Sequence, residues 1–493
     1  MESAATAAPT PGTAVSRMLL VGASAIALLL VLGALLSTWT DEEYSLATTA
    51  HGIAYAYAHA IGFEKQAPLY FVALAAWRAI NASVFFARLS SVVCIAGFLA
   101  VVAALLRRVW PQSPTIVFAA IAFNPFVVYA GVEIRLYASA LFVSALLALF
   151  FMDGFLDARG SLRARLAFVI TAIAAAYLQY YLMFVLVGFG AAVLVVRRTA
   201  LPGYLAACAL IACGMIPLVS IVRAQVGVDA PSELGALSAL RIPLAGAADY
   251  VFPLHWARGA IQRIAYVVLG AIALGSLVAA KPRFDRRTAA FAAIAGVLVA
   301  LFTLVGLLAH VFVIAPRQTV VLFVPLTLFV ASLLATARRP RVALGFGAAY
   351  ALATLLSLAS LYGHGAKTGD WSRVGSALNR VVRAGDIVAV FDADAALPLS
   401  RYYAGNLLRL PRVPRADVFR ADAFVIHSAA EVEAKIGSRA LPRRRLWLVR
   451  NNACTFRNPD YGCAYLDRVV AHDYRIVAER SFFESSIVEL VAR

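Results

Sequence analysis

The chain has 493 residues, of which 62% are hydrophobic and 14% are charged, and its formal net charge is +18. Soluble globular chains carry about 45–50% apolar and about 25% charged residues, so this composition excludes an ordinary soluble protein. The positive charge does not indicate a nucleic-acid partner, because Lys and Arg gather in short loops between apolar runs, as expected for the cytoplasmic loops of a membrane protein.

Apolar runs of about 20 residues recur along the chain, and each is long enough to cross a bilayer core of about 30 Å. Residues 1–16 are rich in Ala, Thr and Pro and are predicted to be a disordered cytoplasmic N-terminus. The first run, Met18 to Leu36, is followed by Ser37-Thr38-Trp39 rather than by a small-residue cleavage site, which predicts a retained helix. We therefore expect a transmembrane domain over 17–362, with a first outer loop over 40–87.

Five basic clusters determine the expected topology. Placing all five in the cytoplasm gives about eleven transmembrane helices, with the N-terminus inside and the tail after Tyr362 outside. The stretch from Leu166 to Val196 is long for one helix and short for two. A hairpin turning at Gln179-Tyr180-Tyr181 keeps both flanking Arg clusters inside, so we favour two helices there. The clusters are Arg107-Arg108, Arg159 to Arg165, Arg197-Arg198, Lys281 to Arg287 and Arg338 to Arg341.

The first outer loop concentrates the acidic residues of the membrane half. Asp41, Glu42 and Glu43 directly follow the first helix, and Glu64 and Lys65 lie further along. Partial burial at a membrane boundary raises the pKa of a carboxyl group and makes it a usable proton acceptor. The competing interpretation is an ordinary solvated acid at the interface.

Two segments of this loop are predicted to lie along the membrane surface. His51, Tyr55 and His59 recur every four residues between Tyr44 and Ile61, which places them on one helical stripe. The stripe favours an amphipathic interface over metal ligation by the two histidines. The segment from Pro68 to Ile80 is too short to span the bilayer.

Two arginines are candidates for binding phosphate at the outer face. Arg135 lies in Glu133-Ile134-Arg135-Leu136-Tyr137, at the outer end of the third and fourth predicted helices, and Arg317 follows Pro316. A guanidinium at a membrane boundary needs a partner or an anionic ligand, and it can grip a phosphate with two N–H groups. The alternatives are an ion pair of Arg135 with Glu133 or Asp41, and a snorkelling anchor for Arg317.

The tail, residues 363–493, changes character and predicts a small soluble α/β domain. Alternating apolar runs and charged turns predict strands at Asp386 to Phe391, Ala423 to His427, Leu446 to Arg450, Ile476 to Ala478 and Ile487 to Val491, and helices at Trp371 to Val382 and Ala429 to Ile436. Cys454 and Cys463 could close a disulfide if the tail faces an oxidising compartment. The fold class is thus an α-helical polytopic membrane protein with a C-terminal α/β domain.

Four segments together resemble the GT-C class of membrane glycosyltransferases. Within that class the chain is most similar to bacterial relatives of protein O-mannosyltransferases, lipid A aminoarabinose transferases and Rgt-type galacturonosyltransferases. The resemblance covers roughly residues 15–345. The four segments are Thr40-Asp41-Glu42-Glu43; Gln66-Ala67-Pro68-Leu69-Tyr70-Phe71 with Ala87-Arg88-Leu89-Ser90-Ser91; Asn124-Pro125-Phe126 through Tyr137; and Gln179-Tyr180-Tyr181.

The resemblance implies a reaction and a set of site residues. A sugar on a polyprenyl-phosphate donor passes to an acceptor hydroxyl on a glycan, lipid or protein at the outer face of a bacterial inner membrane, with inversion. Asp41 matches the catalytic base, with Glu42 beside it. The donor phosphate would contact Arg135, Lys65 and Arg317, and the substrates would contact Glu64, Gln66, Glu133, Tyr137, Tyr180 and Tyr181.

Two other classes of function stay open from the sequence. A transporter or flippase would favour ionisable residues or broken helices near mid-membrane. A non-catalytic assembly protein of the envelope could use the same fold without turnover. The sequence does not identify the sugar, the acceptor or the oligomeric state, and it neither requires nor excludes a divalent cation.

Overall fold

The structure is a computed structural model, and it describes residues 11–110, 114–157, 160–225, 236–253, 260–308, 318–414, 418, 421–437, 445–455 and 460–493. The described chain forms two compact units. The helical unit takes residues up to Ala34 and then those from Thr48 to Ser360. The α/β unit joins Leu35–Ala47 to Leu361–Arg493, so a segment from the start of the chain folds with its end.

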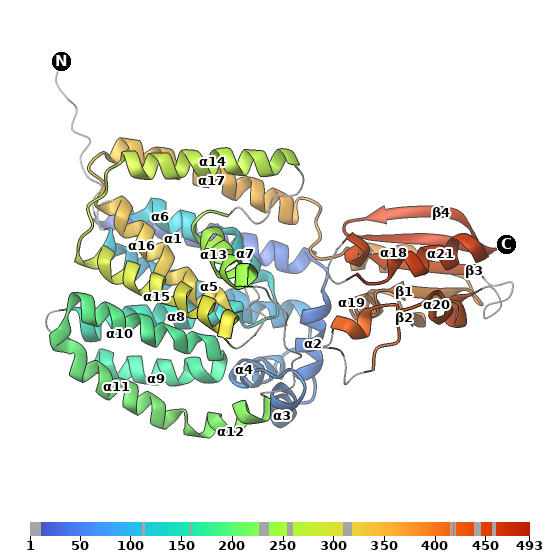
Figure 1. Cartoon of the computed structure of the whole chain (residues 1–493), viewed down its shortest axis with the longest axis horizontal. Helices are drawn as coiled ribbons and strands as arrows, with labels where there is room; N and C mark the ends of the chain where they lie inside the picture. Colours follow the sequence, from blue (N-terminus) through green and yellow to red (C-terminus); the bar gives the residue numbers. More distant parts are fainter. Residues whose placement is uncertain are drawn as a thin grey trace, which may run out of the picture. The chain divides into compact units, whose positions relative to one another are not determined.

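The helical unit is built almost entirely from helices (Figure 1). Two short helices lie in the first outer loop, α3 (Ile53–Gly62) and α4 (Leu69–Arg78). They follow α2 (Thr40–Thr48), most of which belongs to the α/β unit. The remaining helices are α1 (Pro11–Leu35), α5 (Val84–Val109), α6 (Pro114–Ala122), α7 (Pro125–Val132), α8 (Tyr137–Phe151), α9 (Leu162–Leu178), α10 (Phe184–Val196), α11 (Leu201–Gly214), α12 (Ile216–Gln225), α13 (Ala236–Val251), α14 (Ala260–Ala279), α15 (Arg286–Leu308), α16 (Phe323–Ala335) and α17 (Pro340–Tyr362).

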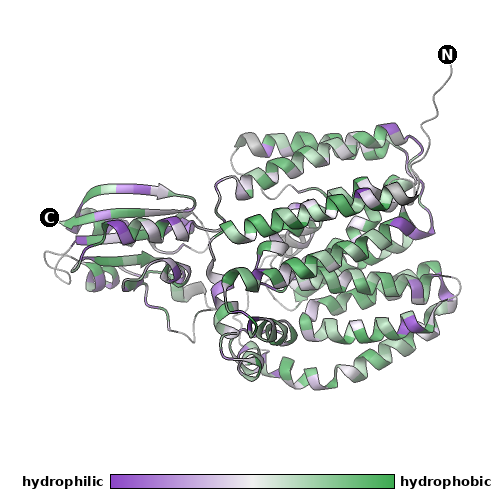
Figure 2. Cartoon of the chain, turned by 180° about the vertical axis from the view of Figure 1, so that it is seen from behind, coloured by the Kyte–Doolittle hydropathy of each residue, from purple (hydrophilic) through white to green (hydrophobic). Residues whose placement is uncertain are grey.

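The helical unit is a membrane-spanning assembly, which confirms the predicted fold class. Among the described residues, five helices are long and apolar enough to cross a bilayer, or up to seven if each of two bent pairs is one span, and four shorter apolar helices accompany them. Leu19, Leu20 and Leu35 on α1 are 69%, 70% and 66% exposed, which would be unfavourable in water and is favourable against lipid tails. Figure 2 shows apolar residues dominating these helices, with hydrophilic ones mostly near their ends.

The segment 166–196 is a pair of helices, as predicted. Helix α9 ends at Leu178, a single 3-10 turn spans Tyr180–Met183, and α10 follows. Phe168 of α9 packs against Phe189 of α10 with ring centroids 5.8 Å apart, and both rings belong to an aromatic cluster with Phe151, Phe155 and Tyr204. Aromatic packing therefore ties the returning helix to its partner and to α8 and α11.

The first outer loop differs in detail from the expectation of one interfacial helix over Tyr44 to Ile61. Two helices, α2 and α3, are separated at Gly52, whose φ of 86° lies in the left-handed region that favours glycine. The expected stripe is present, because Tyr55 stacks on His59 and His59 stacks on Phe63 at centroid distances of 4.9 and 4.6 Å.

The tail folds as a five-stranded sheet with helices on both faces. The strand order is β2 (Leu407–Leu410), β1 (Ile387–Phe391), β3 (Arg445–Asn451), β5 (Ser485–Ala492) and β4 (Tyr474–Phe482). The first three strands are parallel, and β5 and β4 add antiparallel. Because side chains alternate along a strand, Val388 and Val390 face α18 (Trp371–Val381) and α19 (Ala396–Tyr402), whereas Ala389 and Phe391 face α20 (Ala429–Ile436) and α21 (Cys463–Asp473).

The predicted strand at Ala423 to His427 is wrong. This segment begins in a 3-10 turn over Ala421–Phe424 and continues as a loop, in which the Ile426 N–H donates to the Tyr461 carbonyl oxygen. Ile426 is buried in the core of the unit, so its apolar run reflects packing over the sheet rather than membership of it. The short strand β2 and helices α19 and α21 were not predicted from the pattern. Cys454 and Cys463 form a disulfide with their Cα atoms 5.8 Å apart.

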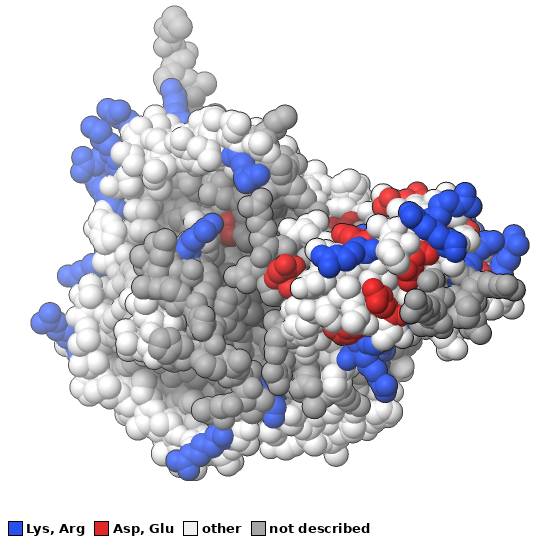
Figure 3. All heavy atoms as spheres, turned by 45° about the vertical axis from the view of Figure 1, so that its right-hand side comes forward, with Lys and Arg blue, Asp and Glu red and all other residues white. Residues whose placement is uncertain are grey.

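Charge separates the two kinds of surface. Figure 3 shows acidic and basic side chains together on the α/β unit, while the helical unit in this view carries separate basic groups and very few acidic ones. Water solvates such mixed charge, whereas a lipid-facing surface excludes it.

Candidate active site

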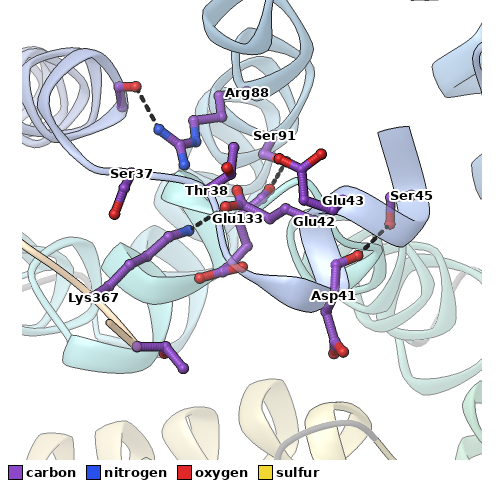
Figure 4. A network of polar contacts seen from close by, with 12 residues as sticks. Ser37, Thr38, Asp41, Glu42, Glu43, Ser45, Arg88, Ser91, Glu133 and Lys367 are labelled. Carbon is purple, nitrogen blue, oxygen red and sulfur yellow. Dashed lines mark hydrogen bonds and ion pairs between the residues drawn. The ribbon is translucent and has the colours of Figure 1, made fainter. Parts of the chain in front are cut away.

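The acidic triplet after the first helix is anchored to the tail within the α/β unit. The Lys367 ammonium lies 3.0 Å from Glu42 Oε2, and both side chains are almost completely buried (Figure 4). A buried carboxylate is tolerated only when it is paired or hydrogen-bonded. The structure therefore gives Glu42 an anchoring partner, although the sequence placed it beside the base.

The residues that follow are anchored in the same way. Arg401 grips Glu43 with two N–H groups, each 2.6 Å from a carboxylate oxygen. The Tyr44 hydroxyl donates to Asp394 Oδ1 at 2.9 Å. On the other side of the triplet, the Tyr402 hydroxyl accepts from the Thr38 N–H at 2.9 Å. The tail thus holds the start of α2 on both sides of Asp41.

Asp41 itself is half-buried at the first turn of α2. Its main-chain carbonyl accepts from the Ser45 hydroxyl at 3.2 Å, a contact drawn in Figure 4. Since the residues on both sides are anchored, the backbone at Asp41 is held in place, and its side chain keeps partial access to solvent. Such a position suits a group that must accept a proton from an incoming hydroxyl.

A second carboxylate pair lies at the carboxyl end of β1. Burial raises the pKa of Asp394 to about 7, and repulsion by Asp392 and Asp41 adds to this, against the hydrogen bond from Tyr44 and the charge of Arg409. Burial also raises the pKa of Asp392, whose Oδ1 accepts from Asn451 Nδ2 at 3.1 Å. Asp394 therefore changes charge near neutral pH in contact with the helix that carries Asp41.

The helical unit holds a second polar group of predicted site residues. Arg135 and Glu64 are buried, with Arg135 Nη1 3.7 Å from Glu64 Oε2. The other Glu64 oxygen accepts from the Thr48 hydroxyl at 2.7 Å, and Thr48 contacts His59 Nδ1 at 2.9 Å. Glu64 is thus an ion-pair partner of Arg135 that the sequence did not suggest.

A glutamine from a later helix ties two predicted segments together. Gln225, at the end of α12, donates from Nε2 to the Gln66 carbonyl oxygen at 3.2 Å and accepts from the Tyr180 hydroxyl at 3.0 Å. Gln66 and Tyr180 are therefore linked in one hydrogen-bonded group. Nothing in the local sequence around Gln225 indicated this role.

The remaining predicted residues lie nearby in the helical unit or outside the described residues. Glu133 is buried, and its carbonyl oxygen accepts from Ser91 at 2.6 Å. Tyr137 packs on Tyr129, and Tyr181 packs on Phe302. The backbone of Lys65 lies in the left-handed region, with a φ of 53°. Arg317 lies outside the described residues.

Asp41 and Arg135 belong to different units, so their predicted convergence in one cavity stays a prediction. The residues that sequence reasoning missed are the anchors from the tail: Lys367, Arg401, Tyr402 and Asp394. Arg401 and Glu43 are 358 positions apart, and no local pattern links positions so distant. Within the described residues, no cluster of three or more His, Cys, Asp or Glu side chains is arranged to hold a metal ion.

Comparison with known proteins gives structural likeness only. No protein-family model matches the chain, and no curated protein sequence matches it. The crystal structure of ArnT from Cupriavidus metallidurans bound to undecaprenyl phosphate matches with a TM-score of 0.45 and 13% identity, over 96% of this chain and 97% of that chain. The apo structure of the same protein gives 0.46 and 14%, over 97% and 98%.

ArnT is a GT-C aminoarabinose transferase, and aminoarabinose transferases are among the proteins that the sequence motifs resemble. Likeness at this identity and TM-score does not by itself assign an activity to the chain.

Proposed function

We propose that this chain is a membrane glycosyltransferase that moves a sugar from a polyprenyl-phosphate donor to an acceptor hydroxyl, with Asp41 as the base. The reaction is a single displacement with inversion. The acceptor oxygen forms a bond to the anomeric carbon, the bond from that carbon to the phosphate oxygen breaks, and the acceptor proton passes to Asp41. The polyprenyl chain stays in lipid throughout.

The observation that carries this proposal is the anchoring of the backbone on both sides of Asp41. Ion pairs through Glu42 and Glu43 hold the helix start, and they consume the two neighbouring carboxylates. A general base is effective when its geometry is fixed before the substrate arrives, because no reorganisation is needed at the moment of reaction. A solvated interface acid would not need four separate anchors around it.

Arg135 supplies the charge that the leaving group needs. Its guanidinium is buried and lies in an ion pair with Glu64, and a guanidinium presents N–H donors in a planar fork that matches a phosphate. A phosphate leaving group departs more easily when a preorganised cation faces its developing charge. The resemblance gives Lys65 and Arg317 the same task.

The broken pair α6 and α7 does not favour a transporter. The pair α6 and α7 bends by 50°, but Asn124 caps the second helix by accepting from the Phe126 N–H at 2.8 Å. The same side chain donates to the Tyr350 hydroxyl at 2.8 Å. The break is thus satisfied inside packed protein, whereas transporters leave broken helices lining a substrate cavity.

We place the reaction on the outer face of a bacterial inner membrane, with the N-terminus cytoplasmic and the α/β unit periplasmic. The positive-inside distribution supports this orientation. A disulfide in the α/β unit supports an oxidising compartment for it. The acceptor is a glycan, lipid or protein of the envelope.

The test compares envelope glycolipids and glycoproteins by mass spectrometry in cells that carry the wild-type gene, no gene, or Asp41→Asn. We expect Asp41→Asn to lower product at least 100-fold at normal membrane expression, since general bases contribute about 10²–10⁴-fold. Arg135→Lys keeps the charge but not the two-pronged grip and should lower product by about 10-fold or more.

The matched control is Asp467→Asn, which makes the same chemical change at an exposed ion pair with Arg450 in the α/β unit. It should leave product unchanged. Wild-type levels of product from Asp41→Asn would refute the assignment of the base. Identical glycan profiles with and without the gene would refute the transferase itself.

A further inference from the structure

A cavity of about 250 Å³ opens in the α/β unit, outside the contacts around α2. Its walls come from the segment after α17, from α18 and from the end of β4 with the following turn. The polar residues that the argument uses are His364, Asp370, Arg373 and Arg480. A cavity of this size holds a small headgroup rather than a drug-sized ligand.

Asp370 gives the cavity a buried acceptor that lacks a donor. Its side chain is 2% exposed, and its Oδ2 lies 2.5 Å from Arg373 Nε. Its Oδ1 is buried without a hydrogen-bond partner among the described residues. Leaving a buried charged acceptor unsatisfied costs about 1–3 kcal/mol or more, so such atoms are usually met by water or a ligand.

Two guanidiniums line the same cavity as this carboxylate. Arg373 is fixed by Asp370 and donates to the His364 carbonyl oxygen. Arg480 lies over the Phe482 ring at 5.2 Å from its centroid and makes no ion pair among the described residues. The cavity therefore presents several donors and a net positive charge, together with one acceptor at its wall.

We propose that this cavity binds a phosphate ester whose alcohol part carries a free hydroxyl, as in the glycerol phosphate headgroup of an anionic lipid. The phosphate oxygens accept from Arg480 and Arg373, which suit phosphate because a guanidinium can present two parallel N–H groups. The hydroxyl donates to Asp370 Oδ1. A bare phosphate dianion would meet the same carboxylate with repulsion and is the poorer ligand.

The chain connection favours a lipid as the source of this headgroup. His364 is two residues beyond Tyr362, the last residue of α17 and of the candidate span Arg341–Tyr362. Consecutive Cα atoms are about 3.8 Å apart, so the cavity wall lies within about 8 Å of the end of that span. Lipid phosphates lie near the ends of spanning helices. The binding site does not depend on the transfer reaction proposed above.

The experiment uses the purified full-length chain in neutral detergent and native mass spectrometry. Short-chain phosphatidylglycerol, short-chain phosphatidylcholine and free sn-glycerol 3-phosphate are titrated in separate arms. We expect phosphatidylglycerol to bind at least about tenfold more tightly to wild type than to Arg480→Ala, as loss of one charge-assisted hydrogen bond predicts. Phosphatidylcholine lacks the hydroxyl and the net charge. It should therefore bind to wild type no more tightly than it binds to Arg480→Ala.

Arg475→Ala is the matched control, because it removes the same exposed charge from the same strand without touching the cavity. It should bind phosphatidylglycerol like wild type. Asp370→Asn is a second variant, which keeps the shape of the side chain but weakens its acceptance of the ligand hydroxyl. It should lower the affinity for phosphatidylglycerol. A thermal unfolding measurement on the same variant checks that it is folded.

The arms separate the two sources of the ligand. Tight binding of the lipid alone supports a membrane headgroup, and equal binding of free glycerol phosphate supports a soluble phosphate ester with the same chemistry. Equal phosphatidylglycerol affinity in wild type and Arg480→Ala, or equal affinity for phosphatidylcholine, would overturn the proposal.

Discussion

The two units solve the problem of charge in opposite ways. In the helical unit, apolar side chains face outward, and its polar site is a compact buried group around Glu64 and Arg135. In the α/β unit, charged side chains cover the surface, and buried charges are paired across the chain, as with Glu42 and Lys367. The helical unit thus keeps these charges in one buried group, whereas the α/β unit uses ion pairs to join segments that are distant in the sequence.

This difference explains why the segment Leu35–Ala47 folds with the tail. Its three acidic residues would be costly within the lipid-facing half, because carboxylates in hydrocarbon need partners or water. The tail supplies an ammonium for Glu42 and a guanidinium for Glu43, and it also hydrogen-bonds the residues on either side of the triplet. The comparison teaches that the tail is a structural part of the predicted active site rather than an appended module.

The largest loss of stability is expected for Lys367→Ala. It removes the ammonium that faces the fully buried Glu42 carboxylate. Removing one partner of a buried pair typically costs about 3–5 kcal/mol, since the other charge stays behind. We expect a clear fall in the thermal unfolding midpoint of the full-length chain and a loss of transfer activity.

Two further variants separate the loss of an ion-pair partner from the loss of packing. Lys367→Met combined with Glu42→Gln removes both charges and should recover most of the lost stability. Arg401→Ala breaks a pair whose arginine and glutamate side chains are 36% and 12% exposed, so it should cost less than Lys367→Ala. A cost for Arg401→Ala that matched or exceeded that of Lys367→Ala would show that burial does not govern these anchors.

The next effect is a dependence on pH through Asp394. Its pKa is about 7 in the folded chain and about 3.9 when unfolded, so between these values the folded chain keeps a proton that the unfolded chain loses. Stability is therefore highest below about pH 4, falls as the pH rises to about 7, and is level above that, as far as this group is concerned. The total change is a few kcal/mol at most.

Asp394→Asn should remove this slope and raise the unfolding midpoint at pH 8 relative to wild type. The amide oxygen can still accept from Tyr44, so the anchor on α2 is kept. The measurement is the difference in midpoint between wild type and variant from pH 5 to pH 9. A difference that stayed constant over this range would contradict a titrating Asp394.

The sequence was sufficient for those features that depend on local pattern. The apolar runs, the turn at Gln179-Tyr180-Tyr181 and four of the five strands follow from periodicity and charge, because these signals act over a few residues. The misassigned strand around Ile426 shows the limit. An apolar run of five residues has the same pattern whether it joins a sheet or packs across it, and tertiary contacts decide.

The candidate site was only partly predictable for the same reason. Asp41, Glu64 and Arg135 stand out because charge is rare in the membrane half, where each ionisable group calls for an explanation. Lys367 and Arg401 do not stand out, since the tail is rich in basic residues and nothing marks two of them as partners of residues more than 300 positions earlier. Pairing at that distance is a property of the fold.

The smallest predicted effect tests the other side of the comparison, where packing rather than charge joins the helices. A Cβ on Gly188 of α10 would lie 3.0 Å from Ile294 Cγ2 and 3.2 Å from Ile294 Cα on α15. Small residues let membrane helices approach closely, and filling such a contact costs about 1 kcal/mol or somewhat more because the backbone must shift.

Gly296→Ala is the matched control on α15, where nothing lies within 4 Å of the added carbon. We expect Gly188→Ala to lower the unfolding midpoint by a few degrees and Gly296→Ala to leave it unchanged or raise it, since alanine favours the helix. Equal midpoints for the two variants would mean that close helix approach contributes little here, and that the helical unit, like the α/β unit, depends mainly on its polar contacts.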